Sequence, residues 1–134
     1  MPHCVILYTP NVERITDMTV LCRALADTML TVLDESGKQV FPTGGTRVLA
    51  YPAAHYAVAD GKGDYGFVYL NVRMAAGRSE AVKKHAGDTL TAVVKQHFAP
   101  VFDASLIGIT LQIDESAGQV YDAKHSTLHP LFNK

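Results

Sequence analysis

In the first half of the chain, the hydrophobic residues fall into one short run and one stretch of helical spacing. Residues 3–8 are an apolar run suited to a buried strand. Apolar positions then recur every three or four residues, which predicts a helix with Thr16 or Asp17 as its N-cap. These positions are Met18, Leu21, Cys22, Leu25, Met29 and Val32. Gly37 marks the end region of this helix, and extended segments interrupted by proline and glycine are expected over residues 39–51.

The second half of the chain repeats this order of elements. Residues 64–74 alternate as in a strand with one buried face. One face carries Val68, Leu70, Val72 and Met74, and the other carries Tyr65, Phe67, Tyr69 and Arg73. Gly77 breaks this strand, Ser79 can cap a second helix, and Pro100 is expected to close it. The apolar stripe of that helix is Val82, Ala86, Leu90, Val93 and Phe98. The fourth strand is expected over residues 106–113.

Strand–helix–strand, occurring twice, predicts an α/β fold with two consecutive βαβ units and parallel strands within each unit. The four strands would form one sheet with both helices on one face. We expect a single domain over residues 1–134, with halves of roughly 1–58 and 59–134. The other sheet face, carrying Tyr65, Phe67 and Tyr69, would stay uncovered, which favours oligomerisation. Residues 124–134 are a second candidate for contact with a neighbouring subunit.

Composition narrows the class of protein. The chain has 134 residues and a net charge of −1, so it lacks the basic surface expected of a protein that binds nucleic acid or an acidic membrane. No apolar run approaches the roughly 20 residues of a spanning helix, and the start lacks the layout of a signal peptide. A soluble, cytoplasmic protein is expected. Cys4 and Cys22 are interpreted as small buried residues rather than a disulfide or a nucleophile.

Pro2 follows the initiator methionine, which is normally removed before so small a residue. The mature chain would then begin with a secondary amine at the start of the first strand. Such an amine can act as a general base, because burial and nearby cations tune its proton affinity. The alternative is that Pro2 only promotes efficient trimming.

Several short motifs occur in a familiar order along the chain. They are Met1-Pro2-His3, Phe41-Pro42-x-x-Gly45-x-Arg47, Ala59-Asp60-Gly61, Asp64-Tyr65-x-Phe67-Val68, Ala76-Gly77-Arg78-Ser79 and Lys95-x-His97-Phe98. With a doubled βαβ unit and an amino-terminal proline, the sequence resembles the tautomerase superfamily. Within it, the sequence is most similar to the 5-carboxymethyl-2-hydroxymuconate isomerase family. The resemblance extends to about Glu115; residues 116–127 match poorly, and the first helix matches only in pattern.

The resemblance implies a tautomerase-like fold and an isomerase that shifts a proton in 5-carboxymethyl-2-hydroxymuconate or a similar dienol polycarboxylate. Such enzymes serve homoprotocatechuate degradation, use no metal or organic cofactor, and form homotrimers with active sites between subunits. Carried onto this chain, the resemblance makes Pro2 the base that shuttles the proton. Arg47 and Arg78 become the arginines that bind the substrate, and Arg47 is also assigned a catalytic role.

The chemistry explains why these residue types suit the reaction. A free α-amine titrates near ~8, and burial beside guanidinium groups favours its neutral, basic form. Arginine stays charged and matches a carboxylate with two parallel hydrogen bonds, so Arg47 can stabilise negative charge that develops during proton transfer. A solvated surface role is the alternative for Arg47 and for Arg78. His3 either binds a substrate carboxylate or is a buried structural histidine, and Arg73 is interpreted as structural or interfacial.

Other readings stay open. His125 and His129 have a spacing that suits a metal if both lie on one helix, but no third ligand accompanies them, so no metal site is predicted. Gly44 and Gly45 are too short a pair for a phosphate loop. An alternative function is a dehalogenase or decarboxylase of the same fold acting on another unsaturated acid. A further alternative is a non-catalytic trimeric interaction protein in which Pro2 is incidental.

Overall fold

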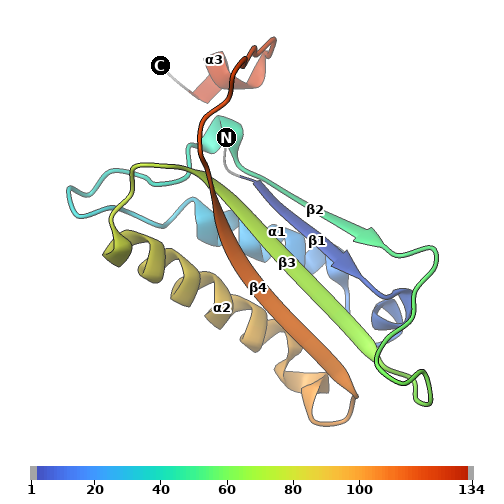
Figure 1. The fold of residues 1–134 in the computed structure, drawn as a ribbon. Coiled ribbons are helices and arrows are strands. Elements are labelled where there is room, and N and C mark those ends of the chain that lie inside the picture. The colour runs from blue at the N-terminus through green and yellow to red at the C-terminus, as the bar shows by residue number, and fades with distance from the viewer. Residues whose placement is uncertain (1–2, 133–134) are drawn as a thin grey trace.

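The computed structural model describes residues 3–132 and shows a four-stranded sheet with two long helices on one face (Figure 1). The strands are β1 (His3–Tyr8), β2 (Arg47–Pro52), β3 (Gly66–Ala75) and β4 (Ile107–Ser116). The α-helices are α1 (Met18–Met29), α2 (Glu80–Phe102) and the short α3 (Leu128–Phe132). Two 3₁₀ helices, η1 (Pro10–Arg14) and η2 (Thr43–Gly45), lie in the connections. Within residues 3–132, no helix combines the length and hydrophobicity that crossing a bilayer requires.

The strand order is β2-β1-β3-β4, and this order decides which chain segments meet. β1 and β2 are parallel, β3 and β4 are parallel, and β1 is antiparallel to β3. The predicted pair of βαβ units is therefore confirmed. Because the central strands are antiparallel, β1 and β2 begin at the same end of the sheet at which β3 and β4 finish. We call this end of the sheet the His3 end.

The core lies between the sheet and the two long helices, as the alternating pattern predicts. The inward-facing strand residues are fully or nearly fully buried, and they include Cys4, Ile6, Val68, Leu70, Val72 and Met74. Asp17 caps α1 by accepting hydrogen bonds from the amides of Thr19 and Val20 at 2.9 and 3.2 Å. Ser79 caps α2 by accepting from the amide of Val82 at 3.2 Å. Both predicted caps are confirmed.

The uncovered sheet face is also confirmed, but one of its predicted members is wrong. Tyr65 precedes β3, which begins at Gly66, and its hydroxyl donates to Asp60 Oδ1 at 2.9 Å. That hydrogen bond holds Tyr65 in the turn instead of on the strand. The large apolar side chains exposed on the face are Leu7, Leu49, Tyr51 and Phe67.

The predicted ends of both long helices are wrong. α2 continues through Pro100 to Phe102. Proline removes one amide, whose bond would have gone to the carbonyl of Gln96 on the exposed side of the last turns, so the loss there is small. α1 ends at Met29, well before Gly37. Gly37 instead has φ of 82° in a tight turn, where its amide donates to the carbonyl of Asp34.

The buried apolar stripe of α2 differs from the prediction at one position. Val94 is buried where Val93 was expected, and Val93 packs half-buried against the core. Both valines fit a helical period that continues past the expected end, so the error does not alter which face of α2 meets the sheet.

Candidate active site

The strand register gathers charged residues at the His3 end. His3 is paired with Arg47 of β2 on one side and with Arg73 of β3 on the other. Residues paired across strands project to the same face, so all three side chains lie on the sheet face that the long helices leave open. Pro2 lies outside the described residues and directly precedes His3 in the sequence.

Two adjoining cavities open at this end of the sheet. The first, the His3 cavity, has a volume of about 340 Å³ and is lined by His3, Arg73 and the segment that follows β4. The second, the Arg47 cavity, has a volume of about 230 Å³ and is lined by Arg47, Gly45 and the segment that leads into α3. Asp122 lines both cavities, which shows that they adjoin.

The Arg47 cavity carries an excess of positive charge. Arg47 and Lys124 line it together with His125 and His129, while Asp122 is its single acidic residue. Lys124 Nζ lies 2.5 Å from Asp122 Oδ2, and this contact is the main reason that the pKa of Asp122 is lowered. With Asp122 already matched by Lys124, the Arg47 guanidinium is left to attract an anion.

The His3 cavity combines a fixed cation with an unsatisfied nitrogen. Arg73 Nε donates to Asn71 Oδ1 at 3.2 Å, and Asn71 Nδ2 donates to Asp114 Oδ2 at 2.7 Å. This chain of hydrogen bonds orients Arg73 beside His3. Nδ1 of His3 is buried and has no hydrogen-bond partner within residues 3–132. A buried polar atom without a partner costs free energy, and such atoms are a feature of sites that await a ligand.

Arg78 lies near these cavities but lines neither of them. It follows Ala75 and Ala76, which line the His3 cavity, and Gly77, whose φ of 106° turns the chain away from β3. Its Nη2 donates to the carbonyl of Val40 at 2.7 Å, and its Nε is buried without a partner in the described part of the chain. The structure thus brings His3 and Arg47 together and holds Arg78 against the connection between α1 and η2.

Five charged or titratable side chains line the cavities without having been predicted there: Arg73, Asp122, Lys124, His125 and His129. His125 and His129 both line the Arg47 cavity, but α3 begins at Leu128, so the two histidines do not lie on one helix. Within residues 3–132, no group of three or more His, Cys, Asp or Glu side chains is placed to hold a metal ion.

The sequence signal for this C-terminal wall is Gly44. A Cβ at that position would lie 3.2 Å from the Cα of His129, closer than ordinary contact. Gly44 therefore allows a close approach of two backbone segments.

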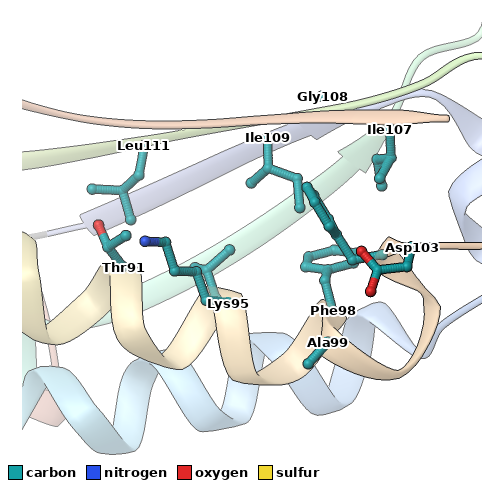
Figure 2. A pocket seen from close by; sticks show the side chains of 11 residues that line it. Thr91, Lys95, Phe98, Ala99, Asp103, Ile107, Gly108, Ile109 and Leu111 are labelled. Carbon is teal, nitrogen blue, oxygen red and sulfur yellow. The ribbon is translucent and has the colours of Figure 1, made fainter. Parts of the chain in front are cut away.

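The largest cavity among the described residues lies elsewhere and is apolar. It measures about 700 Å³ and separates the last turns of α2 from β4. Figure 2 shows the side chains of Phe98, Ile107, Ile109 and Leu111 facing this space, with Lys95 and Asp103 on its α2 side. None of the residues predicted for catalysis or substrate binding lines it. The concentration of cations at the His3 end makes that end the candidate active site.

Comparisons with known proteins agree with the fold. The model of the 5-carboxymethyl-2-hydroxymuconate isomerase family matches residues 2–132. The 5-carboxymethyl-2-hydroxymuconate Delta-isomerase of Escherichia coli is 26% identical over 132 residues, which cover 98% of this chain and 99% of that protein. A fused 4-OT described as an asymmetric trimer is 19% identical with a TM-score of 0.53, covers 96% of this chain and 98% of that one, and shares the fold alone.

Two solved structures are much more similar. A crystal structure of 5-carboxymethyl-2-hydroxymuconate delta-isomerase is 56% identical, with a TM-score of 0.94, over 100% of this chain and 94% of that one. A 5-carboxymethyl-2-hydroxymuconate isomerase from Deinococcus radiodurans R1 is 32% identical, with a TM-score of 0.83, over 99% and 95% of the two chains. The fold is that of the tautomerase superfamily, and this chain belongs to the 5-carboxymethyl-2-hydroxymuconate isomerase family.

Proposed function

We propose that this protein converts the dienol form of 5-carboxymethyl-2-hydroxymuconate, or a closely similar dienol polycarboxylate, into its conjugated 2-oxo isomer. The observation that carries the proposal is the family match over residues 2–132, which includes the residues gathered at the His3 end. The reaction moves one proton between two atoms of a single substrate. It therefore needs one group that accepts and returns a proton, and cations that hold carboxylates and stabilise an enolate.

Pro2 is the proposed base. It directly precedes His3, whose partners in the sheet are Arg47 and Arg73. Because Pro2 is bonded to His3 and consecutive Cα atoms lie about 3.8 Å apart, the proposal places the amine near these side chains. Nearby positive charge favours the neutral amine, which has the lone pair that proton abstraction requires.

Arg47 and Arg78 are proposed to bind the substrate from different directions. Arg47, exposed at the start of β2, would hold the carboxylate beside the 2-oxo group and stabilise charge that develops on that oxygen. Arg78, which is half-buried, would bind one of the two carboxylates remote from the 2-oxo group through its guanidinium, while Nη2 stays on the carbonyl of Val40. His3, which lines the His3 cavity, would contribute to the same set of contacts.

We also propose a homotrimer in the cytoplasm, with active sites between subunits. Leu7, Tyr51 and Phe67 are exposed on the open sheet face, and Leu7 is paired with Tyr51 and Tyr69. A contiguous apolar surface of this kind favours association. A neighbour with the same fold is described as a trimer.

The test of assembly is light scattering at micromolar concentration. Leu7→Asp should dissociate the trimer, whereas Leu33→Asp should not, although both leucines are 48% exposed. A wild-type protein with the mass of a single chain would remove the trimer from the proposal.

The test of function follows the ultraviolet absorbance of 2-hydroxymuconate and its 5-carboxymethyl derivative as they ketonise. We expect protein freed of Met1 to accelerate the reaction without added metal, and a chelator to leave the rate unchanged. Loss of activity with chelator that zinc restores would contradict the proposed chemistry. Turnover of a halogenated or 3-oxo acid without turnover of the dienols would favour the dehalogenase or decarboxylase instead. No turnover of any of them by the trimer would favour an interaction protein.

A further inference from the structure

The segment after β4 folds back over the His3 end of the sheet. Residues 117–127 leave β4 in an extended course and lead into α3, which packs against η2 (Figure 1). This course brings the C-terminal part of the chain to the start of β2, where Arg47 lies. Two chain segments from opposite halves of the sequence therefore line the Arg47 cavity.

The contact between α3 and η2 is close and locally supported. Gly44 is buried, and its lack of a side chain lets the backbone of His129 approach. Ser126 accepts hydrogen bonds from the amides of Leu128 and His129 at 3.0 and 3.3 Å, and its hydroxyl lies 3.0 Å from His129 Nδ1. The bend that precedes α3 is thus fixed by Ser126, and this fixes the direction from which Lys124 and His125 reach the cavity.

Lys124 and Asp122 supply the charge on this wall of the cavity. Their side chains form an ion pair and are half and 39% exposed, so solvent and solutes reach both of them. Asp122 lines the junction of the two cavities, between the His3 side and the Arg47 side. The carboxylate of Asp122 therefore already occupies a cavity that Arg47 of β2 and Lys124 of the C-terminal segment also line.

We propose that the C-terminal segment is part of the substrate site and that Lys124 binds the substrate carboxylate farthest from the reacting enol. Asp122 holds Lys124 in the empty cavity and competes with that carboxylate for it. The inference rests on the proposed function in one respect, since it takes the ligand to be a dienol with more than one carboxylate. The ligand class is an unsaturated dicarboxylate or tricarboxylate of the muconate type.

The first test is equilibrium binding of trans,trans-muconate, a stable dicarboxylate, measured by calorimetry on the full chain. Lys124→Ala should raise the Kd about tenfold, as expected for the loss of one charge-assisted hydrogen bond that is partly exposed to solvent. Lys62→Ala is the matched control, because Lys62 is an exposed lysine in the turn before β3 at the opposite end of the sheet. It should leave the Kd unchanged.

The second test uses variants whose effects should differ in sign. Asp122→Asn removes the competing carboxylate and should lower the Kd for muconate. Gly44→Ala should raise it, because the new Cβ would lie 3.2 Å from the backbone of His129 and displace α3. Gly87→Ala is its control, since a Cβ there meets only the Cδ1 of Ile113 at 3.5 Å. If Asp122→Asn and Lys124→Ala both raised the Kd for muconate, the ion pair would have a structural role and the inference would be overturned.

The third test separates this inference from the proposed function. Lys124→Ala should raise the KM for 2-hydroxymuconate and leave the KM for 2-hydroxypenta-2,4-dienoate unchanged, because the second dienol lacks the distal carboxylate. If wild-type protein isomerises neither dienol, but its binding of muconate depends on Lys124, the proposed function is wrong and the carboxylate-binding role of Lys124 is retained. Wild-type protein that does not bind muconate at millimolar concentration, or Lys124→Ala that binds it normally, would refute the site.

Discussion

The two ends of the sheet use polar residues in different ways. At the end where β1 finishes, most polar groups are bonded to one another: the Tyr8 hydroxyl donates to Glu13, and Asn11 Nδ2 donates to Asp64 and to the carbonyl of Tyr65 at 2.9 and 2.8 Å. Asn11 Oδ1 is buried there without a partner in residues 3–132. At the His3 end, His3 Nδ1 and Arg78 Nε are buried without partners in residues 3–132. Unpartnered buried atoms thus occur at both ends, and the His3 end differs in the cations that line its cavities, Arg47, Arg73 and Lys124.

Among single substitutions, the largest effect on activity should come from Arg47. Arg47→Ala should lower kcat by about 10²–10³-fold, because a positioned donor for developing negative charge is lost. The free energy of unfolding should hardly change, since the side chain is exposed. Arg14→Ala is the control, because Arg14 is an exposed arginine paired with Asp64 at the other end of the sheet. Equal kcat and KM values for the two variants would show that Arg47 is a solvated surface residue without a role in catalysis.

Asn11 should show the reverse pattern. Asn11→Ala should lower the free energy of unfolding by about 1–3 kcal/mol, because it removes a buried amide with two hydrogen bonds to the turn before β3. Its kcat and KM should stay at wild-type values. Urea unfolding followed by circular dichroism measures the change in the free energy of unfolding. A loss of kcat without a loss of stability would show that Asn11 belongs to the active site and would contradict the difference between the two ends.

Arg78 should affect binding more than chemistry. Arg78→Ala should raise KM about tenfold with a smaller change in kcat, since the role proposed for it is to hold a remote carboxylate. Steady-state kinetics with the tricarboxylate and with 2-hydroxymuconate test this split. A fall in kcat as large as that of Arg47→Ala, with KM unchanged, would place Arg78 at the reacting atoms instead.

The smallest effect concerns pH and Asp64. Hydrogen bonding from Asn11 is the main reason that the pKa of Asp64 is lowered, with the charge of Arg14 as a further cause. A lowered pKa means that the ionised form stabilises the folded state above the unfolded-state pKa and that this contribution is lost as pH falls through the folded-state pKa. Asp64→Asn should therefore narrow the stability difference between neutral and acidic pH. If the thermal midpoint fell equally from neutral to acidic pH in the wild type and in Asp64→Asn, the Asp64 carboxylate would not contribute to the pH dependence of stability.

The sequence predicts most of the fold because the fold depends on local periodicity. Alternation identifies the buried face of β3, and helical spacing identifies the inner face of α1. The errors occur where one contact overrides the local preference. The hydrogen bond to Asp60 removes Tyr65 from the strand, and Pro100 is tolerated because its missing amide lies in an exposed turn.

The site is predicted only in part. His3 and Arg47 meet because strand pairing brings them together, which the βαβ pattern already implies. The role proposed for Lys124 has no local sequence signature, since the position of Lys124 depends on a contact between α3 and η2. The position of Arg78 likewise depends on the carbonyl of Val40, a partner that no periodicity specifies.

The central claim is that the amine of Pro2 performs the proton transfer, and the most direct test compares the same chain with and without Met1. Methionine aminopeptidase treatment supplies the second form, mass spectrometry verifies each, and both are assayed side by side on 2-hydroxymuconate. An amide nitrogen has no basic lone pair, so protein that retains Met1 should keep its fold but lose about 10²–10⁴-fold in kcat/KM. Equal rates from the two forms would contradict the account and remove Pro2 from the mechanism.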